Sequence, residues 1–285
     1  MGNQSTIPTA DDIRERLAIS SIYLHPDGGR LDARRIADIR KAGITRIEID
    51  GCLSRKHYDY RDREQVAEIA SECERQGVSV VSVHCPGLPH TSDYEGVRRA
   101  VISESLTSAR VAEELGASFF VLHLGLGDLA ERTACEMLEA LGDRSIKLAT
   151  ENGADLKNFA AFVDKIGSAR LGMVVDIGHT RDHDKVNPFT KKDCARQTIG
   201  VCGTRLFHLH LHDFVDSDHY PPFDGCIQWK ELFLGLQDID YKGWYMFESA
   251  GMTSPEDTLK KVAAFPAGFA ERYGGEKAIT TDASH

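Results

Sequence analysis

The feature that most restricts how this chain can fold is an eightfold alternation of short apolar runs and longer segments with helical periodicity. The apolar runs are rich in β-branched and aromatic residues, which favour strands. They cover residues 19–24, 44–50, 78–84, 119–124, 146–151, 171–176, 206–212 and 244–248. The segments with helical pattern or composition cover residues 32–41, 63–75, 94–115, 131–141, 156–166, 190–199, 229–236 and 255–265. Strands that alternate with helices in this way are typical of a parallel sheet covered by helices.

Eight such units predict an α/β protein built as a single (β/α)8 TIM barrel. The chain has 285 residues, a length that this fold commonly occupies, and 41% of its residues are apolar, which is enough for a large core. No low-complexity linker divides the sequence, so we expect one domain over residues 1–285. Within it, residues 1–15 are expected to form an N-terminal extension and residues 274–285 a loosely ordered C-terminal tail.

The composition limits the partners and the compartment. The formal net charge is −10, which disfavours a nucleic-acid partner because such binders normally carry a basic face. The seven cysteines are odd in number, widely spaced and without a CxxC pair, which favours free thiols in a reducing compartment. The N-terminal residues lack the apolar core of a signal peptide, and no run reaches the roughly 18 apolar residues of a membrane span. We therefore expect a cytoplasmic protein that binds neither membrane nor nucleic acid.

Residues 206–214, LFHLHLHDF, combine a strand pattern with chemically active side chains. His208, His210 and His212 alternate with apolar residues, so a strand would direct all three imidazoles to one face. A row of imidazoles is costly to bury without partners. The pattern therefore indicates a metal site or an acid/base cluster on that face, with other strands supplying the remaining groups. A solvent-facing, histidine-rich edge strand is the alternative.

Polar side chains recur at the carboxyl ends of the predicted strands. In a parallel barrel these ends meet at one mouth, where the following loops build the active site. The residues in such positions are Glu48, His84, His123, Glu151, Asp176, His179, His210 and Glu248. Taken singly, Glu48, His84 and His208 fit structural roles better than ligand roles. The functional site is indicated by the common position of all these residues at the carboxyl ends of the strands.

Four of the polar residues arrive from four successive strands: Glu151, Asp176, His210 and Glu248. Three carboxylates that face one another repel strongly unless a cation lies between them. Oxygen-rich ligation with one imidazole suits Mn²⁺, Mg²⁺ or Co²⁺, and the additional histidines keep Zn²⁺ open. The sequence thus predicts a divalent-metal site at the barrel mouth.

Five segments together carry a resemblance to a known family: ATENG, VVDIGH, HLHLHD, DHYPPFDGCIQW and YMFES. In this order and spacing, the sequence resembles the xylose isomerase-like TIM barrel superfamily. Within it, the chain is similar to the sugar phosphate isomerase/epimerase family of ketose 3-epimerases, hydroxypyruvate isomerase and inosose dehydratase. The resemblance implies that Glu151, Asp176, His210 and Glu248 bind a divalent metal, with Mn²⁺ as the favoured ion and Mg²⁺, Co²⁺ or Zn²⁺ as alternatives.

The resemblance also implies roles for the residues around the ion. Glu151 and Glu248 would be the catalytic acid/base pair that removes and returns a proton, and Asn152 would steady Glu151. His179 would bind substrate, and His219 would lie at the rim of the site. The full set expected to contact substrate is His179, His123, His84, His219 and Glu48.

The chemistry expected from these residue types is proton transfer next to a carbonyl group. A divalent ion stabilises the enediolate, and two carboxylates allow deprotonation and reprotonation. The outcome is epimerisation, aldose–ketose isomerisation or, with a leaving group on the β-carbon, elimination by a lyase or dehydratase. The expected partner is a small sugar, keto-sugar or polyol of carbohydrate metabolism. A homo-oligomer is compatible with the sequence, which does not determine the oligomeric state.

Two other functions stay open. Endonuclease IV, a distant relative within the resemblance, is a zinc phosphodiesterase whose ligands occupy places similar to many of the polar residues above. Its Asp-x-His after strand seven is replaced here by DSDH at residues 216–219, and no obvious basic DNA-binding loop is present, so this activity is less favoured. The second alternative is a barrel that binds a metal or a polyol without turnover.

Overall fold

Eight parallel strands form the centre of the structure, a computed structural model that describes residues 7–27, 29–52, 54–251 and 253–274. The strands are β1 (Leu17–Ser20), β2 (Arg46–Asp50), β3 (Ser79–His84), β4 (Phe119–Leu122), β5 (Lys147–Glu151), β6 (Leu171–Asp176), β7 (Leu206–His210) and β8 (Tyr245–Phe247). Their order is β7-β6-β5-β4-β3-β2-β1-β8. A parallel bridge between Leu211 and Phe247 connects β7 to β8, with the Leu211 N–H 2.7 Å from the Met246 carbonyl oxygen. The predicted single (β/α)8 TIM barrel is confirmed.

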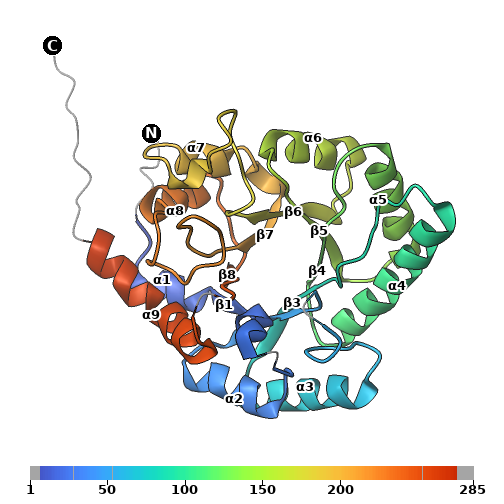
Figure 1. The fold of residues 1–285 in the computed structure, drawn as a ribbon, viewed down its shortest axis with the longest axis horizontal. Helices are drawn as coiled ribbons and strands as arrows, with labels where there is room; N and C mark the ends of the chain where they lie inside the picture. The colour runs from blue at the N-terminus through green and yellow to red at the C-terminus, as the bar shows by residue number, and fades with distance from the viewer. Residues whose placement is uncertain (1–6, 28, 53, 252, 275–285) are drawn as a thin grey trace.

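Helices surround the strands on the outside of the barrel (Figure 1). They are α1 (Ala10–Glu15), α2 (Ala33–Lys41), α3 (Arg63–Gln76), α4 (Glu95–Glu114), α5 (Asp128–Leu141), α6 (Leu156–Ile166), α7 (Ala195–Gly200), α8 (Trp229–Asp238) and α9 (Pro255–Tyr273). Three short 3-10 helices accompany them: η1 (Ser21–Asp27), η2 (Pro188–Thr190) and η3 (Gly203–Arg205). α1 lies in the predicted N-terminal extension, begins with a capping box between Thr9 and Asp12, and buries Ile13. Residues 1–6 and, in the predicted tail, residues 275–285 lie outside the described residues.

The first strand differs from the prediction. It was expected at residues 19–24, but β1 starts at Leu17 and ends at Ser20, and η1 follows directly. The Ser21 hydroxyl accepts the Asp50 N–H at 2.9 Å, at the point where the ladder to β2 stops. Tyr23 is buried in the helical layer. The apolar run therefore continues past the strand because its second half packs outside the sheet.

Two helices also differ from their predicted bounds. The segment expected as a helix at residues 190–199 is split between η2 and α7, because Asp193 has a φ of 62° and this left-handed conformation interrupts a helix. In contrast, α9 continues beyond residue 265, through Pro266, to Tyr273. Phe265 and Phe269 are fully buried on this helix, so packing stabilises it beyond the proline.

The interior of the barrel places an apolar layer beneath the polar one. Val121, Ala149 and Val174 form one buried cluster, and Met246 belongs to another with Ala18 and Val81. Two positions further along β4, β5, β6 and β8 come the predicted site residues His123, Glu151, Asp176 and Glu248. Alternate residues of a strand share a face, so these polar side chains lie on the interior face, one layer nearer the carboxyl ends.

The loop after β3 carries a buried histidine, His90, whose Nε2 lies 2.9 Å from Ser105 Oγ on α4. Burial lowers the pKa of His90 to about 4. An unfolded histidine titrates near pH 6.5, so between these values the unfolded chain binds the proton and the folded chain does not. The contribution of His90 to the free energy of unfolding is therefore fully present above about pH 6.5 and falls by roughly 3 kcal/mol as the pH decreases to about 4.

Urea denaturation of the wild type and of a His90→Gln variant between these two pH values tests this expectation. In the variant, the free energy of unfolding should lose the part of its pH dependence that His90 contributes. This holds whatever the stability of the variant at neutral pH. His183, whose side chain is 87% exposed, provides the matched His183→Gln control, which should keep the wild-type dependence. Equal pH slopes in the two variants would show that His90 titrates normally in the folded protein.

The cysteines are free thiols, as the sequence predicted. Cys85 and Cys202 are buried, and burial raises the pKa of each thiol to about 12. Among the described residues, no helix combines the length and the apolar character needed to cross a bilayer.

Candidate active site

Four side chains converge at the carboxyl ends of β5 to β8: Glu151, Asp176, His210 and Glu248. Each offers one ligand atom, and these four atoms all lie within 4.8 Å of one another. Each residue is at most 4% exposed. The structure thus brings together the four residues that the sequence predicted as a metal-binding set.

His210 lies at the centre of this group. Its Nδ1 is 2.9 Å from Glu248 Oε2 and 3.2 Å from Glu151 Oε2, yet it has no hydrogen-bond partner among the described residues. Burial raises the pKa of Glu151, but contacts with neighbouring imidazoles, chiefly His210, outweigh burial and hold the pKa well below its usual value. Two ionised carboxylates therefore face the same imidazole nitrogen without hydrogen-bond geometry. This donor set fits a divalent cation.

Asp176 has one oxygen engaged and one oxygen free. Its Oδ1 accepts the N–H groups of Gly178 at 2.6 Å and His179 at 3.1 Å, and it lies 3.0 Å from His212 Nε2. Its Oδ2 is buried and has no hydrogen-bond partner within the described part of the chain. A buried carboxylate oxygen without a partner is costly, and a cation would satisfy it.

Asn152 holds the backbone of Asp176 in place. Its Oδ1 accepts the Asp176 N–H at 2.7 Å, and its Nδ2 donates to the Gly153 carbonyl and to Thr180 Oγ1. The family resemblance implies that Asn152 steadies Glu151. The amide group instead connects the loop after β5 to the end of β6.

His212 contacts Asp176, and each of its ring nitrogens has a partner. Its Nδ1 lies 3.0 Å from the His219 backbone nitrogen and 3.2 Å from the Asp213 carbonyl oxygen. Its Nε2 lies 3.0 Å from Asp176 Oδ1. An outer-shell imidazole of this kind orients a carboxylate ligand.

Glu48 lies beneath His210 and is fully buried. Glu48 Oε1 is 3.2 Å from His210 Nε2, and Glu48 Oε2 is 3.2 Å from His208 Nε2 and accepts the Ser82 hydroxyl at 2.7 Å. A proton on His210 Nε2 is therefore directed to Glu48, and Nδ1 lies on the side of Glu151 and Glu248. Carboxylate–histidine pairs of this kind raise the basicity of the ligating nitrogen. Glu48, expected from the sequence to contact substrate, is placed below the mouth, where it orients His210.

A Glu48→Gln variant is expected to bind a divalent ion about 10- to 100-fold more weakly than the wild type, because it loses the charged acceptor for His210 Nε2. Titration calorimetry with Mn²⁺ on chelator-stripped protein measures this effect. Glu74→Gln, an exposed glutamate on α3, is the matched control and should bind normally. Wild-type affinity in a folded Glu48→Gln protein would show that Glu48 does not support His210.

Three partly exposed histidines surround the glutamates. His179 Nδ1 is 3.0 Å from Glu151 Oε1, His123 Nε2 is 3.6 Å from Glu151 Oε2, and His219 Nε2 is 3.8 Å from Glu248 Oε2. Their side chains are 32%, 49% and 22% exposed in that order. We call His123, His179 and His219 the rim histidines. Their partial exposure next to buried carboxylates suits contact with a ligand that enters the mouth.

The charges of the mouth hold protons on two rim histidines. Burial lowers the pKa of His179, but the Asp176 and Glu151 carboxylates outweigh burial and raise the pKa to about 9. Burial also lowers the pKa of His219, but Asp218 and Glu248 outweigh it and raise the pKa to about 11. In this carboxylate-rich mouth, both imidazoles can donate to an oxygen atom of a ligand.

His84 is buried on the other side of Glu151. Its Nε2 is 3.1 Å from Glu151 Oε2, and its Nδ1 lies 3.0 Å from the Cys85 carbonyl oxygen and 3.1 Å from Cys52 Sγ. The sequence indicated His84 but not Cys52, which follows β2 without a recognisable motif. Only the register between β2 and β3, which pairs Asp50 with His84, brings this thiol to the mouth.

Asp213 organises the loop after β7. Its carboxylate accepts the N–H groups of Phe214, Phe223 and Ile227 and the Trp229 indole N–H, at 2.8 to 3.0 Å. This loop carries His219, which stands in the left-handed region with a φ of 66°. An Asp directly after a buried strand is the sequence signal for this anchoring role.

The comparisons with known proteins agree with this architecture. A family model described as xylose isomerase-like TIM barrel matches residues 36–266. The chain therefore belongs to the xylose isomerase-like TIM barrel family. The sequence is 31% identical over 87 residues to a D-psicose 3-epimerase of Enterocloster bolteae. That stretch covers 30% of this chain and 25% of the epimerase, so the chain matches about a quarter of that relative.

Solved structures show the same fold over nearly the whole chain. The crystal structure of a D-tagatose 3-epimerase-like protein matches with a TM-score of 0.71 and 20% identity, over 90% of this chain and 98% of that chain. The crystal structure of the IolI protein with a zinc atom matches with a TM-score of 0.70 and 14% identity, over 92% of this chain and all of that chain. At these identities the similarity is one of fold.

Proposed function

We propose that this protein is a divalent-metal-dependent epimerase or isomerase of a sugar or keto-sugar, with Glu151 and Glu248 as its acid/base pair. The observation that carries the proposal is the paired arrangement of these two carboxylates. Each has an oxygen within 3.2 Å of His210 Nδ1, and each has a rim histidine beside it, His179 for Glu151 and His219 for Glu248. The match to epimerases among the relatives supports the same class.

The proposed ligands of the ion are Glu151 Oε2, Asp176 Oδ2, His210 Nδ1 and Glu248 Oε2. When bound, a divalent ion supplies positive charge beside the substrate carbonyl and so stabilises negative charge that develops on its oxygen. Mn²⁺ is the proposed ion, since three carboxylates and one imidazole form an oxygen-rich set. The zinc atom in the IolI structure makes Zn²⁺ the principal alternative.

Different residues of the chain then have different roles in proton transfer. One glutamate removes the proton from the carbon next to the carbonyl, and the other returns a proton to the opposite face. The rim histidines donate to substrate hydroxyl and carbonyl oxygens. Glu48 and His212 hold His210 and Asp176 in place, and His84 restrains Glu151 from the buried side. We place this reaction in the cytoplasm and in carbohydrate metabolism.

The test is solvent proton exchange. The protein, loaded with Mn²⁺, is incubated in deuterated water with D-fructose, D-psicose and D-tagatose, and proton NMR follows the loss of the signal at C3 or C1. An epimerase should exchange the C3 proton and an isomerase the C1 proton, and a chelator should stop either exchange. No exchange with these ketohexoses or with a wider panel of keto-sugars, from folded and metal-loaded protein, would contradict the proposal.

Two alternatives use overlapping residues and are distinguished by the same samples. A lyase or dehydratase would release a dehydrated product together with exchange. A zinc phosphodiesterase would cut abasic DNA without any C–H exchange. The grouping of His84, His123 and Glu151 within ligand distance is the observation that keeps the phosphodiesterase in the test. A second group within ligand distance, Asp176, His212 and His219, supports the same test, whereas the net charge of −10 weakens the phosphodiesterase.

A further inference from the structure

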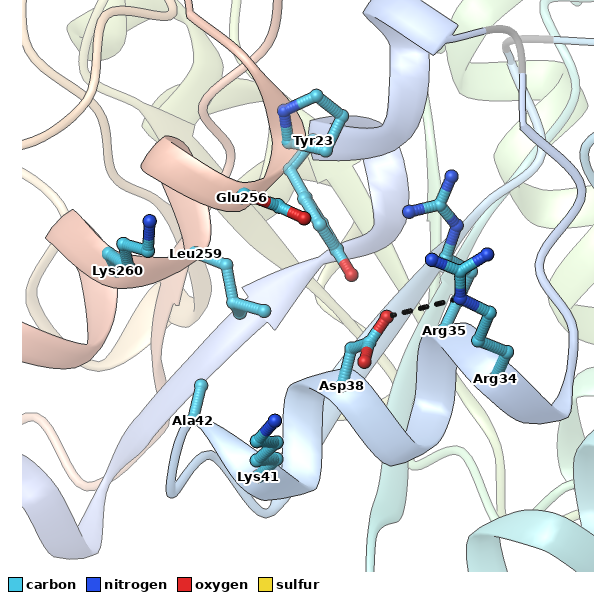
Figure 2. Close-up of a pocket in the computed structure, with 10 residues that line it drawn as sticks. Tyr23, Arg34, Arg35, Asp38, Lys41, Ala42, Glu256, Leu259 and Lys260 are labelled. Carbon is cyan, nitrogen blue, oxygen red and sulfur yellow. Dashed lines mark ion pairs between the residues drawn. The ribbon is translucent and has the colours of Figure 1, made fainter.

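A second hollow lies on the outside of the barrel, between α2 and α9 (Figure 2). Its volume is about 310 Å³, at the lower end of the range typical of small-molecule sites. None of the residues that line it belongs to the candidate active site. It therefore needs an explanation of its own.

A buried phenol points into this hollow. Tyr23 is 2% exposed, and its hydroxyl oxygen has no hydrogen-bond partner among the described residues. Figure 2 shows the ring descending from η1, with the hydroxyl oxygen in the space between Asp38 on α2 and Leu259 on α9. Burial raises the pKa of this hydroxyl, so it stays protonated and can donate. A buried donor without an acceptor is costly, which favours an acceptor supplied by a ligand.

The charged groups around the hollow are mostly positive. Four lining residues are cations, Arg34, Arg35, Lys41 and Lys260, whereas two are carboxylates, Asp38 and Glu256. Arg34 Nε is 4.0 Å from Asp38 Oδ2 (Figure 2), and Lys260 Nζ is 3.7 Å from Asp257 Oδ1, so both cations are held only in loose, exposed ion pairs that an anion can replace. The protein as a whole has a net charge of −10, so the local charge of the hollow is opposite in sign to the net charge of the protein. A concave, positive site with a buried hydroxyl donor suits a small anion with several acceptor oxygens.

We propose that this hollow is a second binding site, for a small organic phosphate whose oxygens accept from the Tyr23 hydroxyl and from Arg34 and Lys260. The site is independent of the barrel chemistry. A ligand there would connect η1, which follows β1, to α9, which follows β8. Binding should therefore also raise the thermal stability of the protein.

The experiment uses the full chain, stripped of metal, and glycerol 3-phosphate as the probe in titration calorimetry, with glycerol as the uncharged control. Wild-type protein should bind the phosphate ester at one saturable site and should show no binding of glycerol. A Tyr23→Phe variant keeps the ring and should bind about 3- to 10-fold more weakly. An Arg34→Ala, Lys260→Ala double variant should bind at least about 10-fold more weakly. Lys157→Ala, an exposed lysine on α6, is the matched control and should bind within about twofold of wild type.

Three results would overturn the proposal. The first is absence of saturable binding at millimolar probe. The second is equal affinity in the double variant and the Lys157→Ala control. The third is a changed affinity, in either direction, in a Glu248→Gln variant, which would place the phosphate at the barrel mouth. Thermal melts of all variants without probe establish that they fold, and a probe-induced rise confined to wild type and control would support the site.

Discussion

A Glu248→Gln variant is expected to fold normally and to lose proton exchange by about 10³-fold or more. Glu248 is 4% exposed, and the carboxamide has the same size as the carboxylate, so packing is preserved. The change removes a negative charge 2.9 Å from His210 Nδ1 and with it a proton acceptor. The measurement is the rate of deuterium incorporation into a reactive keto-sugar at saturating Mn²⁺.

The matched control for this variant is Glu271→Gln, which removes an exposed glutamate from α9 and should exchange at the wild-type rate. Metal content is measured on the same samples, because Glu248 is also a proposed ligand. A Glu248→Gln protein that retains its metal and exchanges normally would exclude Glu248 from the acid/base pair. Loss of exchange with retained metal would separate the proton-transfer role from the ligand role.

An Asp176→Asn variant is expected to lose more than about 100-fold in divalent-metal affinity, beyond the range expected for outer-shell changes such as Glu48→Gln. The amide oxygen can still accept the N–H groups of Gly178 and His179, so the local backbone should keep its conformation. Burial raises the pKa of Asp176, but the imidazoles, chiefly His212, outweigh burial and hold it below its usual value, so the folded protein favours the charged carboxylate and the metal-free variant should melt below metal-free wild type. Calorimetric titration and thermal melts provide the two readouts.

Asp184 offers the matched control for this variant. With Asp182 and His183 it forms a surface group that has ligand-like spacing, and Asp184 and His183 are exposed. Asp184→Asn should leave metal affinity unchanged. If Asp184→Asn weakened binding while Asp176→Asn did not, the ion would be bound at this surface group and the barrel-mouth assignment would be wrong.

The barrel and its four central residues were predictable because both follow from short-range patterns. Each strand is an apolar run of about the right length, and Glu151, Asp176 and Glu248 each stand where such a run ends. In a closed parallel barrel that position alone determines which residues meet. The order of the strands in the sequence, together with the fact that their carboxyl ends meet at one mouth, is therefore enough to predict which residues form the site.

Other features depended on contacts between distant segments and could not be read from the sequence. The predicted first strand is too late in the sequence because the aromatic ring of Tyr23 is buried outside the sheet, next to the helices. The contact of Cys52 with His84 depends on the register between β2 and β3. The contact of His212 Nδ1 with the backbone N–H of His219, seven residues away, depends on the loop after β7 folding back.

One divalent cation is proposed to bind among Glu151, Asp176, His210 and Glu248. Crystals of the Mn²⁺-loaded protein, with diffraction recorded on both sides of the manganese absorption edge, test it most directly. We expect the dominant anomalous peak between the side chains of these four residues. A dominant peak at the surface group of Asp182, His183 and Asp184, with no peak among the four, would contradict it.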